Sequence, residues 1–143
     1  MALVILSCVL LIVATTLTHY EALNLMTRLL ESPRWPGRAK LIAAVLGCFL
    51  SHGVEILLYG TAYWALIRLG GHGSLGAGAA PGLDSALYFS AETYTSLGFG
   101  DVVPAGPVRL LAGVEALNGL LLIGWSASFL YLEMERYWRR RER

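Results

Sequence analysis

The stretch Thr95-Ser96-Leu97-Gly98-Phe99-Gly100-Asp101 decides the fold of this chain. Gly98 and Gly100 alternate with residues that carry side chains, and glycine adopts left-handed backbone angles that other residues resist. Alternation of the two backbone hands lets successive carbonyl groups point to one side of an extended loop. Rings of such carbonyls, from several copies of the chain, can replace the hydration shell of an alkali cation. Glycine pairs also occur in many ordinary turns. The flanking segments must therefore decide between an ordinary turn and a loop that coordinates an ion.

The surrounding chain is unusually apolar, with 56% hydrophobic and 15% charged residues among 143. A soluble domain carries about 25% charged residues, so this composition favours a membrane protein. It also excludes an intrinsically disordered chain, which is poor in apolar residues. The two cysteines, Cys8 and Cys48, lie within apolar runs and are expected to be small buried hydrophobes rather than a disulfide scaffold.

Three apolar segments are candidates to cross a bilayer, since a spanning helix needs at least about 17 residues. The first starts with an uncharged run over residues 2–17, the second covers 41–67 and the third covers 108–134. A shorter apolar piece, 83–94, would be about 18 Å long as a helix and cannot span. It is predicted to be a re-entrant half-helix, whose broken backbone must be buried in protein or line water.

Basic residues form two clusters, one between the first two segments and one after the third. They are Arg28, Arg34, Arg38 and Lys40, then Arg136, Arg139, Arg140, Arg141 and Arg143. The positive-inside rule makes both clusters cytoplasmic and places the N-terminus and the loop 70–107 outside a cell (inner) membrane. The first segment can instead be a cleaved signal peptide, although no basic residue precedes its apolar run.

Residues 95–101 resemble the selectivity filter of potassium channels, whose usual form is T-[TS]-[VIL]-G-[YF]-G-D. Upstream, Phe89-Ser90-Ala91-Glu92-Thr93 resembles the pore-helix end of bacterial two-transmembrane potassium channels. Downstream, Val102-Val103-Pro104 continues the match, and Gly119 falls where the family often has a hinge glycine. The resemblance covers residues 40–135 and leaves the first helix outside it.

The resemblance implies an all-α membrane protein with three transmembrane helices, a re-entrant pore helix and an extended filter, assembled as a homotetramer. An extra N-terminal helix with a cytoplasmic linker occupies 1–39, the pore domain 40–135 and a basic cytoplasmic tail 136–143. Within the pore domain, the expected parts are an outer helix over 40–69, a flexible turret over 70–83, a pore helix over 84–95, the filter over 96–101 and an inner helix over 107–135.

The implied function is passive, potassium-selective conduction rather than catalysis, with no cofactor besides potassium as the permeant ion. Potassium would be held by Ser96, Leu97, Gly98 and Phe99, with Gly100 completing the filter and the Ser96 hydroxyl at the innermost site. Serine replaces the commoner threonine there, which leaves open a weakly selective cation channel. A non-conducting membrane subunit that docks through its first helix is the alternative from a different class.

Three residues are expected to support the filter, namely Tyr88, Glu92 and Asp101. In the resembling channels the positions of Glu92 and Asp101 meet, and two carboxylates that close share one proton near neutral pH. Tyr88 lies four residues before Glu92 on the same helical face and can donate to Asp101. Alternatively, Asp101 lies in water at the mouth and concentrates cations.

A second polar set lies at membrane depth, where ionisable residues are functional candidates. It consists of His52, Glu55, Glu115 and Asn118. The set can be a proton-sensitive network between outer and inner helix, or a hydrogen-bonded set that only holds helices together. If Glu115 faces the cavity, it attracts cations instead. The sequence shows no metal-ligand motif.

On the inner helix, Gly119 and Gly124 can be hinges or can simply permit close packing. Ile123, Ala127 and Tyr131 are the expected cavity or gate residues, because they recur at helical spacing. The basic tail either lies on anionic lipid headgroups or is a plain stop-transfer anchor. Lipid, potassium and identical subunits are the expected partners, and nucleic acid is not.

Overall fold

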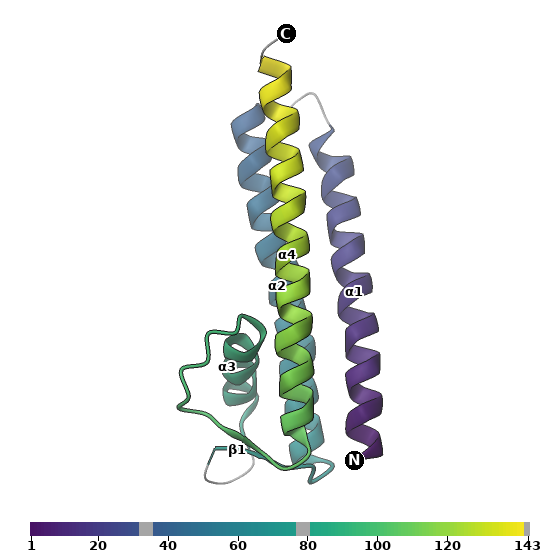
Figure 1. The fold of residues 1–143 in the computed structure, drawn as a ribbon, viewed down its shortest axis with the longest axis vertical. Coiled ribbons are helices and arrows are strands. Elements are labelled where there is room, and N and C mark those ends of the chain that lie inside the picture. The colour runs from purple at the N-terminus through teal and green to yellow at the C-terminus, as the bar shows by residue number, and fades with distance from the viewer. Residues whose placement is uncertain (32–35, 77–80, 142–143) are drawn as a thin grey trace.

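The computed structural model describes residues 1–31, 36–76 and 81–141, so Arg34 and Arg143 of the basic clusters lie outside the described residues. The elements are α1 (Ala2–Leu30), α2 (Gly37–Arg68), β1 (Ser74–Leu75), α3 (Leu83–Tyr94), β2 (Pro104–Ala105) and α4 (Val108–Arg141). The helices α1, α2 and α4 are long rods, and the short α3 packs beside one end of α2 (Figure 1). The predicted all-α class, with three helices long and apolar enough to cross a membrane, is confirmed.

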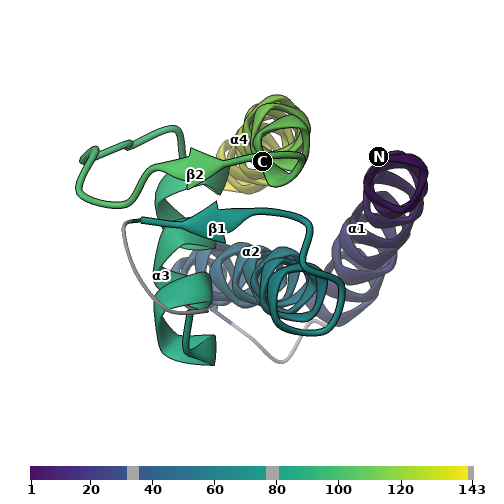
Figure 2. The ribbon, with the colours of Figure 1, turned by 90° about the horizontal axis from the view of Figure 1, so that it is seen from below.

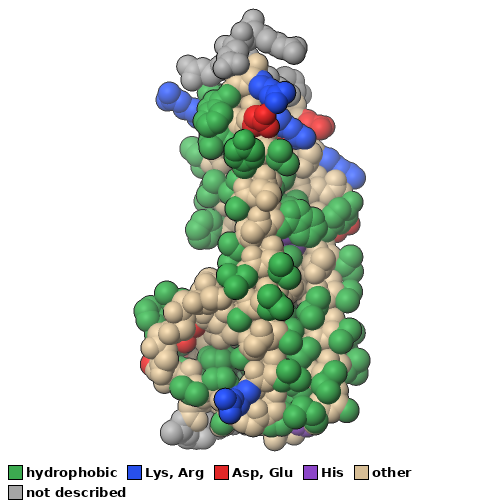
Figure 3. Space-filling model, in the orientation of Figure 1, with side chains coloured by type: hydrophobic (Ala, Val, Ile, Leu, Met, Phe, Trp, Pro, Cys, Tyr) green, Lys and Arg blue, Asp and Glu red, His purple; other side chains and the backbone are tan. Residues whose placement is uncertain are grey.

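The long helices are apolar on most sides, which is typical of helices that face lipid. Large hydrophobic side chains remain exposed along them, among them Phe49 at 74% and Leu50 at 73%. Figure 3 shows such side chains over much of the visible face, with Lys and Arg gathered mostly near the C-terminal end of α4. The helices therefore present an outer surface suited to hydrocarbon rather than to water.

Seen end-on, α1 and α3 lie on opposite sides of the pair formed by α2 and α4 (Figure 2). The main hydrophobic core lies between all four helices and includes the buried side chains of Tyr59, Tyr63 and Leu111. A smaller cluster joins α1 to α2 through residues such as Met26 and Cys48. Both cysteines are buried and free, as the sequence indicates.

The chain enters the bundle through α3 and returns to the same end through the extended segment 95–107 (Figure 1). The C-terminus of α3 therefore lies partway along the long helices. With the long helices across a bilayer, this gives the geometry of a re-entrant loop.

The segment before α3 contains structure that the sequence analysis did not anticipate. In place of a wholly flexible turret, β1 pairs with β2 in antiparallel register, Ser74 opposite Ala105 and Leu75 opposite Pro104. The Gly76 amide also donates to the Val103 carbonyl at 3.0 Å. Two-residue strands are too short to show an alternating pattern, so periodicity cannot reveal them.

Two helix boundaries also differ from the expected ones. The helix α2 begins at Gly37, before residue 40, because Pro36 sits in extended backbone at its N-cap and residues after proline can start a helix. The helix α4 continues to Arg141, so the described part of the basic tail is an extension of the inner helix.

Gly119 on α4 permits a close approach to the backbone of α3. A Cβ atom added there would lie 2.2 Å from the backbone carbonyl oxygen of Tyr94, whereas one added at Gly124 would meet nothing within 4 Å among the described residues. We expect Gly119→Ala to destabilise the fold by about 1–3 kcal/mol, because the clash is with backbone and cannot be relieved by a rotamer change. Thermal unfolding in detergent, followed by circular dichroism, measures this, with Gly124→Ala as the matched control. Equal Tm values for the two variants would contradict the close contact.

Candidate ion-conduction site

The helix α3 ends in a Schellman motif, which determines where the filter segment begins. The Leu97 amide donates to the Glu92 carbonyl at 2.9 Å, and the Ser96 amide donates to the Thr93 carbonyl at 3.0 Å. Ser96 occupies the left-handed position of the motif, with φ 57°. Glycine is usual there, and a left-handed conformation costs other residues about 1–2 kcal/mol.

Beyond this turn the backbone alternates in hand. The φ angles of Ser96, Gly98 and Gly100 are positive, at 57°, 55° and 80°, while Leu97 and Phe99 are not in this region. The glycines stand at two of the three left-handed positions, where a side chain would be strained. This is the alternation by which consecutive carbonyls in an extended segment can share one side.

The filter segment is exposed along its length within the single chain. The side chains of Leu97 and Phe99 are 59% and 67% exposed, and Val103 beyond them is 60% exposed. Apolar side chains on an unpartnered segment typically mark an interaction surface. Helix α3 stands behind the segment, and its C-terminal dipole end favours a cation near Ser96.

The expected filter supports occupy different environments. The Tyr88 hydroxyl donates to the Asp101 carboxylate at 3.0 Å, and the Val102 amide donates to the other oxygen of Asp101 at 3.1 Å. Glu92 is buried, and its Oε1 atom has no hydrogen-bond partner among the described residues. Tyr88 is therefore connected to Asp101, and among the described residues no hydrogen bond joins the carboxyl groups of Glu92 and Asp101.

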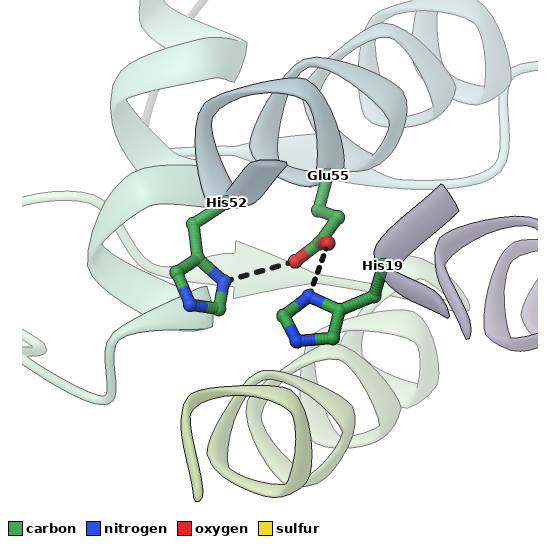
Figure 4. Close-up of side chains that lie close together, drawn as sticks. All are labelled: His19, His52 and Glu55. Atoms are coloured by element: carbon green, nitrogen blue, oxygen red, sulfur yellow. Dashed lines mark hydrogen bonds and ion pairs between the residues drawn. The ribbon is translucent and has the colours of Figure 1, made fainter. Parts of the chain in front are cut away.

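Glu55 is the centre of the largest polar cluster. Its Oε1 atom lies 2.9 Å from His19 Nδ1 and accepts a hydrogen bond from Ser51, and its Oε2 atom lies 3.0 Å from His52 Nδ1. The Tyr94 hydroxyl also donates to Oε2. Figure 4 shows the two imidazole rings on α1 and α2 turned towards the carboxylate. The cluster therefore joins α1, α2 and α3.

Glu115 forms a separate site between α4, α2 and α3. The hydroxyl groups of Tyr63 and Ser90 each donate to one of its oxygens at 2.6 Å, and the side chain is completely buried. The carboxylate therefore points into the bundle and not into a cavity. This arrangement matches the structural alternative for Glu115.

Asn118 has a third set of partners. Its Nδ2 atom donates to Thr15 Oγ1 at 2.8 Å and to the Tyr59 hydroxyl at 3.1 Å. The four polar residues singled out from the sequence thus belong to three separate groups: His52 and Glu55 share one, while Glu115 and Asn118 each have their own partners.

The sequence reasoning missed the partners on α1 and the hydroxyl groups of Tyr59, Tyr63 and Tyr94. His19 lies 36 residues from Glu55, and Thr15 lies 103 residues from Asn118. Such partners cannot be found from local spacing. The available signal was the position of His19 within the first long helix, because ionisable residues at membrane depth are usually paired.

The expected gate residues differ in their surroundings. Gly124, Ala127 and Tyr131 are exposed on α4 in the single chain, whereas Ile123 packs against the main core. Gly119 is buried against Tyr94. Hinge motion at either glycine stays a prediction.

A re-entrant helix, a filter-like segment with alternating hand and three membrane-length helices define a pore-forming membrane protein. Residues 52–135 match the profile of the family described as "Ion channel", and the chain belongs to this family. It is similar to the inward rectifier potassium channel Kirbac3.1 of Paramagnetospirillum magnetotacticum, with 32% identity over 104 residues. The alignment covers 71% of this chain and 31% of the relative, so the chain spans about a third of that relative's length. The chain is thus a multi-pass membrane protein of an ion-channel family.

The Glu115 site gives a stability prediction. Tyr63→Phe removes one of the two donors to a fully buried carboxylate, and the loss is expected to cost about 1–3 kcal/mol. Thermal unfolding of the purified protein in detergent measures the effect. Tyr20→Phe, at a tyrosine that is 51% exposed, is the matched control and should leave Tm unchanged. A Tyr63→Phe variant with the Tm of the wild type would show that this hydrogen bond makes no net contribution to stability.

Proposed function

We propose that four copies of this chain form a potassium-selective channel that conducts potassium passively down its electrochemical gradient. The observation that carries the proposal is the alternating backbone hand at Ser96, Gly98 and Gly100. Four such segments around an axis would offer rings of carbonyl oxygens from Ser96, Leu97, Gly98 and Phe99 that replace the water shell of the ion. The relative named a potassium channel supports this choice of ion.

The tetramer is proposed because one chain supplies only one side of a coordination shell. The exposure of Leu97 and Phe99 supports it, since copies packed around the filter would cover these apolar side chains. Four dipole ends of α3 directed at the inner end of the filter would lower the cost of holding a cation in a low-dielectric region.

Behind the filter, we propose that Glu92 is protonated or shares a proton with Asp101. A buried carboxylate oxygen without a partner is costly when ionised, and Oε1 of Glu92 is in this position among the described residues. Tyr88, bonded to Asp101, would complete a support that keeps the filter segment from collapsing or widening.

The proposed orientation in the cell membrane has the N-terminus outside and the C-terminus cytoplasmic. The start of α1, the strands β1 and β2 and the start of α4 lie at one end of the bundle (Figures 1 and 2). Basic side chains gather mostly at the other end (Figure 3). The positive-inside rule then makes that second end cytoplasmic, where the extension of α4 would lie close to anionic headgroups.

The reversal potential of the purified protein in a planar bilayer tests the selectivity. With potassium on one side and sodium on the other, we expect a reversal strongly displaced towards the potassium potential. Gly98→Ala should abolish the selective current, because an added Cβ strains the left-handed backbone at φ 55°. Gly113→Ala, where the added atom meets nothing within 4 Å in the described chain, is the matched control and should conduct normally.

Two other outcomes separate the alternatives. A reversal near zero that is still lost in Gly98→Ala would mean a weakly selective cation channel, with a filter loosened at Ser96. No current from a folded tetramer under varied pH and voltage would favour a non-conducting subunit.

The orientation is tested by labelling introduced cysteines with a membrane-impermeant thiol reagent in intact cells. Arg109→Cys should react and Arg139→Cys should react only after permeabilisation. Background is expected to be low, since the native Cys8 and Cys48 are buried. The opposite labelling pattern would overturn the orientation.

A further inference from the structure

The hydrogen-bonded cluster around Glu55 also brings together side-chain atoms of the kind that bind metal ions. Two imidazole nitrogens and a carboxylate converge from two helices, and the ligand atoms of His19, His52 and Glu55 all lie within 4.8 Å of one another. We propose that these three residues form a binding site for a transition-metal dication, with Zn²⁺ as the best match. Sequence reasoning found no such motif because His19 is contributed by α1, far from the other two along the chain.

The donor set suits zinc. Two imidazoles with one carboxylate are a known three-ligand set for Zn²⁺, at about 2.0–2.2 Å from the metal. Two ligands of a tetrahedral zinc ion are therefore about 3.4 Å apart. The pairs His19–Glu55 and His52–Glu55 are already at 2.9 and 3.0 Å, so they need only open slightly to admit an ion. No two of the ligand atoms are more than 4.8 Å apart. Bringing a pair from that distance to about 3.4 Å requires a movement of about 1.4 Å, which side-chain rotations can supply.

The second nitrogen of each ring is held in the way that metal-binding histidines require. Ser126 Oγ on α4 lies 3.0 Å from His52 Nε2 and 3.3 Å from His19 Nε2. With both Nδ1 atoms on the metal, both Nε2 atoms carry protons, and the two lone pairs of this hydroxyl can accept them. Such outer hydrogen bonds fix ring orientation and tautomer in metal sites. Ser126 would thus position both histidines at once.

A fourth ligand is available at the same place. Ser51 Oγ lies 2.9 Å from Glu55 Oε1 and 3.4 Å from His19 Nδ1. The Tyr94 hydroxyl lies 2.9 Å from His52 Nδ1. Either oxygen, or a water molecule, can complete a tetrahedron. Protons are the competing occupants, since each Nδ1 atom that now donates to Glu55 must give up its proton, which in a neutral ring is replaced by one on Nε2.

The three ligands differ in exposure. The side chains of His19 and Glu55 are completely buried, but that of His52 is 18% exposed in the chain. His52 would therefore meet an incoming ion first and pass it to the buried ligands.

Metal binding is expected to change the geometry of the filter, an effect that rests on the proposed channel function. Tyr94 donates to the Glu55 oxygen that faces His52, and it lies two residues before Ser96. An ion bound to Glu55 and His52 competes for that oxygen and displaces or recruits the Tyr94 hydroxyl. We expect Zn²⁺ to reduce the current, although binding itself does not depend on conduction.

The binding test uses the full chain purified in detergent and stripped with a chelator, with Co²⁺ as a spectroscopic probe. We expect one Co²⁺ per chain with the strong visible d–d absorption of a tetrahedral site, displaced by Zn²⁺. His19→Asn should weaken Co²⁺ binding at least tenfold, because asparagine keeps an N–H near the Nδ1 position but cannot ligate. Glu55→Gln should do the same. His72→Asn is the matched control, since His72 is the third histidine of the chain and lies in the loop after α2.

Each variant is first checked for wild-type elution and a cooperative melting transition, so that lost binding is not lost folding. As a second measurement, Zn²⁺ should raise the Tm of wild type and of His72→Asn but not that of His19→Asn. No Co²⁺ absorption in folded wild-type protein would overturn the site and leave protons as its only occupants. Binding that survives in His19→Asn and Glu55→Gln, or that disappears in His72→Asn, would overturn the ligand assignment.

The coupling between metal binding and the filter is tested by measuring the bilayer current. Zn²⁺ at a concentration that saturates the spectroscopic site should reduce the wild-type bilayer current and leave that of His19→Asn unchanged. Normal Co²⁺ binding with an unaltered current would retain the metal site and overturn its coupling to the filter. A protein that binds Co²⁺ but never conducts would overturn the proposed channel function while leaving the metal site standing.

Discussion

Tyr94 holds the end of α3 against two other helices. Its backbone carbonyl packs against Gly119 of α4, and its hydroxyl donates to Glu55 of α2. The last helical residue of α3 is therefore held from two sides, and the Schellman turn at Ser96 follows at once. Residues 96–101 make few packing contacts within the single chain. The position of Ser96 is therefore set by the contacts that hold Tyr94.

The membrane adds a second constraint, which explains the polar interior. An unpaired polar group at membrane depth costs several kcal/mol. Two of the buried carboxylates, Glu55 and Glu115, have hydrogen-bond donors on both oxygens. These bonds link helices that apolar packing alone would hold weakly in lipid, since lipid tails compete equally for apolar side chains. Buried polarity thus gives the bundle a defined arrangement.

Much of the architecture could be predicted because its determinants are local in sequence. Apolar length identifies the three long helices, and the shortness of residues 83–94 identifies α3. The glycine spacing indicates left-handed backbone at Gly98 and Gly100, but the same conformation at Ser96 depends on the helix end and was not foreseen. The contacts of His19 and Thr15 were also missed, because they depend on how α1 is placed against distant helices. The pairing of β1 with β2 was not predicted, because strands of two residues each are too short to show an alternating hydrophobic pattern.

The attachment of α1 has a consequence for how such a chain can be shortened. Although α1 lies on the side of α2 and α4 away from α3, it supplies partners to Glu55 and to Asn118. In a truncated chain that begins at α2, Glu55 would lose its hydrogen bond with His19 and Asn118 its hydrogen bond to Thr15, on the side that α1 now covers. The first helix is consequently not a separable appendage to a minimal pore, and a minimal version of this protein would need compensating apolar replacements at both positions.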